Sequence, residues 1–267
     1  MKPLIPQILH IGPLSIHSYG ITFALAVASA YLVGRWAAAK RGIANDKYDD
    51  LAFWAVVIGF IGARAYYVLT YPQYYSGNLI EIFKTWDGGL SIFGGLLFGI
   101  AAVVWRTHHH KINFWNAADS IAIGIPLAQA IGRIGNYINY EAFGNPTNLP
   151  WKIFIPLANR PAGYTQFSYF QPTFLYELIA DLLIFTILIV WFNISSNKLN
   201  EKKVKHPGLF FGAYLLLYSI ARYFIEGVRL DSSYILGSHF LRFDQFTAIL
   251  LFAAGCGILY RSLHYEA

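Results

Sequence analysis

The chain has 267 residues, of which 56% are hydrophobic and 18% aromatic, while only 13% are charged. Soluble domains carry about 25% charged residues, so this composition excludes an ordinary soluble protein and indicates an integral membrane protein. The net charge of +6 would suggest a nucleic-acid partner in a soluble protein, but here the basic residues gather in alternate loops between apolar runs. Membrane topology explains that pattern, and we expect no nucleic-acid partner.

Seven apolar runs are long enough to form transmembrane helices of roughly 20 residues each. They extend over about Ser18–Trp36, Tyr48–Thr70, Leu90–Trp105, Trp115–Ile134, Phe174–Phe192, Pro207–Gly227 and Phe243–Tyr260. We therefore predict an all-α integral membrane protein, with residues 1–267 forming a single transmembrane domain. The only cysteine, Cys256, excludes a disulfide framework and a CxxC metal site, and we expect no metal and no cofactor.

Basic residues follow the first, third, fifth and seventh runs. They are Arg35, Lys40, Arg41, Lys47, Arg106, Lys111, Lys198, Lys202, Lys203, Lys205 and Arg261. Because cytoplasmic loops are enriched in Lys and Arg, this order predicts an N-terminus outside and a C-terminus in the cytoplasm. The loop 136–171, between the fourth and fifth runs, is rich in Asn, Pro and aromatic residues, which indicates a folded extracytoplasmic arm.

Arginines lie at the outer ends of two apolar runs. Arg133 ends the fourth, and Arg222 and Arg229 end the sixth, while Arg64 lies deeper in the second. A guanidinium is costly in hydrocarbon and usually faces a protein interior or a water-filled cavity. Arginine is also well suited to paired contacts with phosphate, so the cluster predicts a lipid-phosphate site. The alternative is structural pairing with acids, for which the candidates are Glu141, Glu177, Asp181 and Glu226.

Helical spacing places several of these groups on shared faces. Arg133 and Asn136 are three residues apart, and Arg222 and Glu226 are four apart. At the start of the third run, the N–H groups near Gly88, Gly89 and Ser91 would favour an anion, although glycines there also suit close helix packing. Tyr19, at the outer end of the first run, suits either aromatic anchoring or the site.

Six motifs occur in a fixed order, in residues 16–20, 62–64, 86–95, 132–144, 171–177 and 222–229. The longest is Gly-Arg-Ile-Gly-Asn-Tyr-Ile-Asn-Tyr-Glu-Ala-Phe-Gly, which ends at Gly144. Together they resemble the bacterial phosphatidylglycerol–prolipoprotein diacylglyceryl transferases over nearly the whole chain. The resemblance implies that the diacylglyceryl group of phosphatidylglycerol moves to the lipobox cysteine thiol of a preprolipoprotein. A thioether forms and glycerol 1-phosphate leaves, at the extracytoplasmic face of the bacterial cytoplasmic (inner) membrane.

The resemblance and the residue chemistry give a predicted site. Its catalytic members are Arg133, which the resemblance implies binds the lipid phosphate, Arg222 and Glu141. Its substrate-binding members are Arg133, Asn136, Asn139, Gly144, Tyr19, Arg64, Gly88, Gly89, Ser91, Tyr176, Glu177, Glu226 and Arg229. Glu141 is a candidate either to accept the thiol proton or to orient an arginine.

Two positions depart from the family pattern. Phe93 and Gln171 stand where some members have histidine, so a mechanism with either histidine as an indispensable base cannot hold for this chain. The competing interpretation is a polytopic lipid or anion transporter, which also needs intramembrane arginines but predicts charges spread through the membrane depth. A membrane receptor without enzymatic activity leaves the density of polar groups between Arg133 and Glu141 unexplained.

Overall fold

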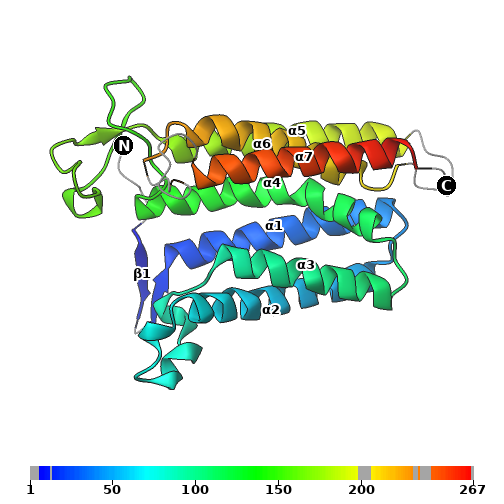
Figure 1. The fold of residues 1–267 in the computed structure, drawn as a ribbon, viewed down its shortest axis with the longest axis horizontal. Helices are drawn as coiled ribbons and strands as arrows, with labels where there is room; N and C mark the ends of the chain where they lie inside the picture. Colours follow the sequence, from blue (N-terminus) through cyan, green and yellow to red (C-terminus); the bar gives the residue numbers. More distant parts are fainter. Residues whose placement is uncertain (1–5, 13, 198–205, 231–233, 235–241, 266–267) are drawn as a thin grey trace. The chain divides into compact units, whose positions relative to one another are not determined.

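The computed structural model describes residues 6–12, 14–197, 206–230, 234 and 242–265. These residues form seven α-helices, as Figure 1 shows: α1 (Ser18–Lys40), α2 (Asn45–Thr70), α3 (Ile92–His109), α4 (Phe114–Asn139), α5 (Thr173–Asn197), α6 (Leu209–Glu226) and α7 (Phe243–Leu263). Four short 3-10 helices accompany them: η1 (Pro72–Tyr74), η2 (Leu79–Phe83), η3 (Thr85–Asp87) and η4 (Leu157–Asn159). The mostly helical fold agrees with the prediction.

Five of the described helices are long and apolar enough to cross a membrane, namely α1, α2, α5, α6 and α7. The other two, α3 and α4, correspond to the third and fourth predicted spans. The last turn of α3 carries Arg106, His108 and His109, and α4 contains Pro126 together with several polar residues. These residues lower the apolar character of the two helices.

Two small antiparallel sheets were not predicted from the sequence. In one, β1 (Ile8–Ile11) pairs with β2 (Leu14–His17), with Leu9 opposite Ile16. Gly12 lies between these strands with φ +59°, a left-handed conformation that glycine adopts readily and that helps the chain reverse. In the other, β3 (Ile153–Phe154) pairs with β4 (Tyr169–Phe170) within the predicted arm.

The arm begins later than expected because α4 continues to Asn139 and not to about Ile134. Its core consists of the buried residues Ala142, Phe143, Ile153, Ile155, Phe170 and Phe174. The arm is thus a packed element with its own small core.

The predicted cytoplasmic residues Lys198, Lys202, Lys203 and Lys205 lie outside the described residues.

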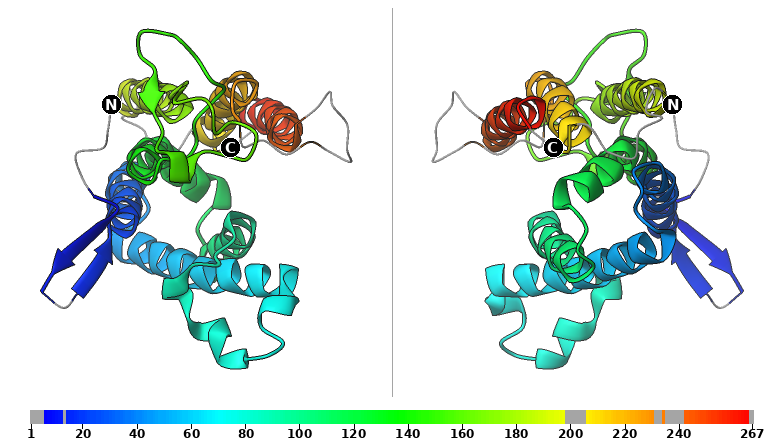
Figure 2. Two further views of the ribbon diagram at one scale, coloured as in Figure 1. Left: turned by 90° about the vertical axis from the view of Figure 1, so that its left-hand side faces the viewer. Right: turned by 90° about the vertical axis from the view of Figure 1, so that its right-hand side faces the viewer.

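The chain divides into two compact units, one of residues 35–118 and the other of residues 1–34 and 119–267. In the first unit, α2 packs closely on α3, and Gly62 lies directly against Phe98. The 3-10 helices η1, η2 and η3 follow α2, as Figure 2 shows. Ion pairs join Arg35 to Asp49 at 2.8 Å and Arg106 to Asp50 at 2.5 Å.

The second unit contains residues 133–144, the longest continuous part of the predicted site. Here α6 packs on α5 and α7, and both views of Figure 2 show α6 beside α7. Gly212 and Gly255 allow close approach of α6 and α7, since a Cβ on Gly255 would lie 3.1 Å from the Gly212 oxygen. The buried Asp119 accepts hydrogen bonds from the backbone N–H groups of Gly208 and Phe211, at 2.8 Å and 2.7 Å. Asp119 therefore satisfies donors at the start of α6.

Candidate active site

The end of α4 presents a chain of polar side chains. Arg133 Nη1 donates to Asn136 Oδ1 at 3.3 Å, consistent with their separation of three residues on one helix. Tyr140 has φ +57°, so the helix stops and the chain turns there. That turn brings Glu141 back toward the helix, where it accepts from the Asn136 and Asn139 amides at 3.5 Å and 3.3 Å. The four predicted residues thus form one hydrogen-bonded group.

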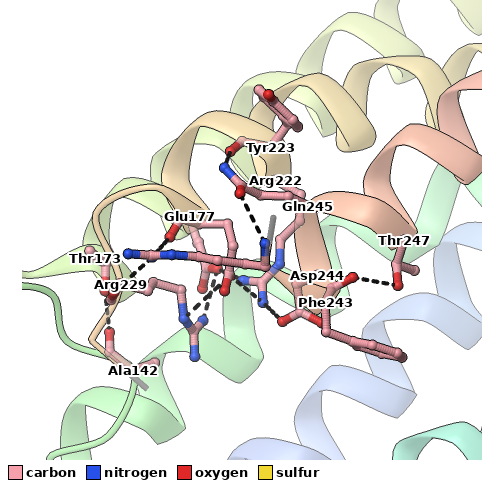
Figure 3. Close-up of polar contacts among 12 residues, drawn as sticks. Ala142, Thr173, Glu177, Arg222, Tyr223, Arg229, Phe243, Asp244, Gln245 and Thr247 are labelled. Atoms are coloured by element: carbon pink, nitrogen blue, oxygen red, sulfur yellow. Dashed lines mark hydrogen bonds and ion pairs between the residues drawn. The ribbon is translucent and has the colours of Figure 1, made fainter. Parts of the chain in front are cut away.

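Glu177 is the centre of the charged network, and only 4% of its side chain is exposed. Its Oε2 lies 2.8 Å from Arg133 Nη1, and its Oε1 lies 3.0 Å from Arg229 Nη1. Arg222 Nη1 also donates to Oε1. Figure 3 shows Glu177 between Arg222 and Arg229, which both come from the end of α6 and the loop that follows it. One buried carboxylate on α5 therefore gathers three of the predicted arginines.

A second carboxylate, Glu226, is 1% exposed and lies on the same face of α6 as Arg222. Its Oε2 is 2.9 Å from Arg222 Nη2 and 3.8 Å from Arg229 Nε. The predicted spacing of Arg222 and Glu226 thus corresponds to a direct contact. Each of these two arginines lies between carboxylates from two helices, α5 and α6.

Sequence reasoning did not select two further charged residues of the network, Asp244 and Arg242. Asp244, in the first turn of α7, contacts Arg222 Nη2, as Figure 3 shows. Arg242 donates through Nη1 to the Glu226 carbonyl oxygen and, at 2.9 Å, to the Arg229 carbonyl oxygen. Their signal was present, because both stand at the outer end of the seventh predicted span, where the topology already placed Arg133 and Arg222.

Gly144 ties the start of the arm to the loop after α6. It forms an antiparallel backbone bridge with Arg229, and its N–H donates to the Gln171 oxygen at 2.8 Å. A Cβ at this position would lie 2.5 Å from the Val228 oxygen, so only glycine fits without displacement. The buried Thr173 adds a hydrogen bond from Oγ1 to the Ala142 oxygen at 2.7 Å.

The two tyrosines of the predicted site lie on the same unit as this network. Tyr19, in the first turn of α1, lies against Gly135 of α4, where a Cβ would approach its ring to 2.9 Å. The hydroxyl of Tyr176, on α5, accepts a hydrogen bond from Trp151 Nε1 at 2.7 Å. Tyr176 therefore joins α5 to the arm, and Tyr19 joins α1 to α4.

Arg64, Gly88, Gly89 and Ser91 form a separate group in the unit of residues 35–118. Arg64 Nε donates to the Ile82 oxygen at 2.7 Å, and Nη1 donates to the oxygens of Gly88 and Gly89 at 2.7 Å and 2.9 Å. Nη2 donates to the oxygens of Glu81 and Lys84 at 2.6 Å and 3.4 Å. All five N–H groups of the guanidinium thus meet backbone carbonyls. Beside it lies a hollow of about 210 Å³, lined in part by Tyr67, Tyr75 and Lys84.

Ser91 is the N-cap residue of α3, and its backbone N–H donates to the Ala63 oxygen at 3.0 Å. Gly88 and Gly89 have φ values of +90° and +77°, which favour glycine.

Among the described residues, no group of three or more His, Cys, Asp or Glu side chains is arranged to hold a metal ion.

The chain matches the family model of prolipoprotein diacylglyceryl transferase over residues 6–261. The chain belongs to this family. The phosphatidylglycerol–prolipoprotein diacylglyceryl transferase of Synechocystis sp. is 41% identical over 255 residues, which cover 96% of this chain and 89% of that protein. The protein of the same name from Cutibacterium acnes is 36% identical over 256 residues, covering 95% of this chain and 83% of that protein. Residues 6–261 span every motif on which the resemblance rests.

Proposed function

We propose that the protein transfers the diacylglyceryl group of phosphatidylglycerol to the lipobox cysteine of preprolipoproteins. The observation that carries this proposal is the family match over residues 6–261, together with relatives named for this reaction. The network of Arg133, Arg222 and Arg229 supplies chemistry that suits the reaction. Their N–H groups contact carboxylate side chains, and a lipid phosphate presents oxygens of similar geometry and charge.

In the proposed reaction, the cysteine sulfur of the substrate attacks the glyceryl C3 carbon. A carbon–sulfur bond forms while the bond between C3 and the phosphate oxygen breaks, and glycerol 1-phosphate leaves with the electron pair. Negative charge therefore increases on the phosphate. Arg133 and Arg222 would stabilise that charge, helped by Asn136 or Asn139, because oriented donors in a dry site act strongly on developing charge.

The thiol must lose its proton for the sulfur to attack. Glu177 suits this role poorly, because its two carboxylate oxygens are already engaged by three arginines. Glu141 accepts hydrogen bonds from two neutral amides and its side chain is exposed, which supports it as the proton acceptor. In the alternative role, Glu141 would orient Arg133 through Asn136.

The topology that fits this function has seven spans, with the N-terminus outside and the C-terminus in the cytoplasm. In the cytoplasmic membrane, the network of Arg133, Arg222 and Arg229 would then face the extracytoplasmic side, where lipobox cysteines become accessible. The distribution of basic residues between the apolar runs supports this orientation. The arm that follows α4 would lie at the same face and contact the peptide substrate.

The decisive experiment uses purified protein in phosphatidylglycerol liposomes with a fluorescent lipobox peptide. The wild type is expected to add diacylglyceryl to the peptide thiol, and Arg133→Ala is expected to lose this activity while still accumulating in the membrane. Full activity in Arg133→Ala would refute the assigned role of Arg133. Movement of labelled phosphatidylglycerol across the bilayer without any peptide modification would favour a transporter instead.

A further inference from the structure

Asp181 lies one helical turn beyond Glu177 on α5, inside an apolar helix. Only 3% of Asp181 is exposed, and its neighbours Ala180 and Leu182 are apolar. A carboxyl group in such a place is costly and usually pairs with another polar group. Its nearest ion-pair partner within the described residues is Arg133, whose Nε lies 3.9 Å from Asp181 Oδ2.

This separation is too long for a hydrogen bond, which requires about 2.7–3.2 Å. Both atoms are buried, and neither has a hydrogen-bond partner within the described part of the chain. Arg133 instead uses Nη1, which meets Glu177 at 2.8 Å and Asn136 at 3.3 Å. The guanidinium is therefore held by Glu177, while its Nε–H and the Asp181 oxygen remain next to each other and unsatisfied.

The groups on α6 that surround Asp181 have other contacts. Tyr214 donates its hydroxyl to Gln129 Oε1 at 3.1 Å, and Arg222 is engaged by Glu177, Glu226 and Asp244. Among the charged groups around Asp181, Arg133 is thus the one whose unsatisfied donor faces it.

We propose that Asp181 is a positioning residue that holds Arg133 when the lipid phosphate is bound. The phosphate takes the place of Glu177 at Nη1, and the guanidinium then moves toward Asp181 until Nε–H donates to Oδ2. The distance needs to shorten from 3.9 Å to about 2.8 Å. With Nε held from the interior, both terminal nitrogens face the phosphate. This inference rests on the proposed function, since it requires Arg133 to bind that phosphate.

The test compares Asp181→Leu, which removes the acceptor, with Asp181→Asn, which keeps an oxygen but removes the charge. The KM for phosphatidylglycerol is expected to rise about tenfold or more in Asp181→Leu and less in Asp181→Asn. The matched control is Thr186→Val on the exposed side of α5, which is expected to leave the KM unchanged. Asp181→Leu with wild-type KM and kcat would overturn the proposal.

A double-mutant cycle separates positioning from a merely structural role. Lysine has no Nε–H donor of this kind, so in an Arg133→Lys background Asp181→Leu is expected to cause no further loss. Lipid affinity is measured by the rise in unfolding temperature on adding phosphatidylglycerol, which needs no residual activity. The same fold-loss from Asp181→Leu in both backgrounds would refute positioning through Arg133. A wild type without transferase activity would instead refute the proposed function.

Discussion

Arg64 and Arg133 are both arginines on apolar helices, but they meet different acceptors. The guanidinium of Arg64 donates to five backbone carbonyls within residues 81–89, which include the end of η2 and the segment that follows it. Arg133, Arg222 and Arg229 meet carboxylate side chains. A lipid phosphate presents oxygens like those of a carboxylate, whereas a ligand at Arg64 would have to displace backbone carbonyls of residues 81–89. The kind of acceptor therefore distinguishes Arg64, which is bound to backbone carbonyls, from the three arginines that contact carboxylate side chains.

The largest expected effect comes from Glu177, because three arginines share its carboxylate. Glu177→Gln is expected to lower the free energy of unfolding by about 3–5 kcal/mol, the range for removing one partner of a buried ion pair. Thermal or denaturant unfolding in detergent measures it. The control is Glu81→Gln, since Glu81 pairs with Lys84 at 2.6 Å at a partly exposed site and is expected to cost about 1 kcal/mol or less. Equal effects of the two changes would contradict the central role of Glu177.

Replacing Arg133 or Arg64 with lysine is expected to change different quantities, namely transfer activity for Arg133 and stability for Arg64. Arg133→Lys should reduce transfer by about a hundredfold with little change in unfolding, because lysine cannot offer paired donors to phosphate. Arg64→Lys should lower the free energy of unfolding by about 2–3 kcal/mol, since several charge-assisted hydrogen bonds are lost. Transfer assays and unfolding curves on both variants measure this. A raised KM for phosphatidylglycerol in Arg64→Lys, with unchanged stability, would instead support Arg64 as a lipid-binding residue.

A smaller effect is expected at Gly89, where the loop approaches Arg64. Gly89→Ala places a Cβ against the Arg64 guanidinium at a φ of +77°, and about 1–2 kcal/mol of stability should be lost. Gly77→Ala is the control, because a Cβ there meets no atom within 4 Å. Unfolding temperatures of the two variants give the comparison. A stable Gly89→Ala protein would indicate that the Arg64 contacts can rearrange without loss.

Helix positions followed well from the sequence, since hydrophobicity and length set them locally. The prediction of a helix over about Tyr48–Thr70 corresponds to α2 at Asn45–Thr70, and that over Phe174–Phe192 corresponds to α5 at Thr173–Asn197. The short strands were missed because two to four residues carry little periodic signal. Their pairing depends on contacts with segments elsewhere in the chain.

The candidate site was predictable where helical spacing decides the contacts. The contacts of Arg133 with Asn136 and of Arg222 with Glu226 are of this kind. The choice of Glu177 as shared partner was not predictable, because Glu141, Asp181 and Glu226 were equally available in the sequence. The carbonyl contacts of Arg64 also depend on how residues 81–89 fold back on α2, which no local pattern encodes.

The bridge between Gly144 and Arg229 has a mechanical consequence. Asn145 donates to the Val228 oxygen at 3.1 Å, and Leu230 donates to the Phe143 oxygen at 3.3 Å. Backbone hydrogen bonds therefore join residues 143–145 to residues 228–230 on both sides of that bridge. If the arm lifts to admit a peptide or release a product, it must carry the backbone of Arg229 with it. Movement of the arm away from the surface would therefore also weaken the ion pair between Arg229 and Glu177.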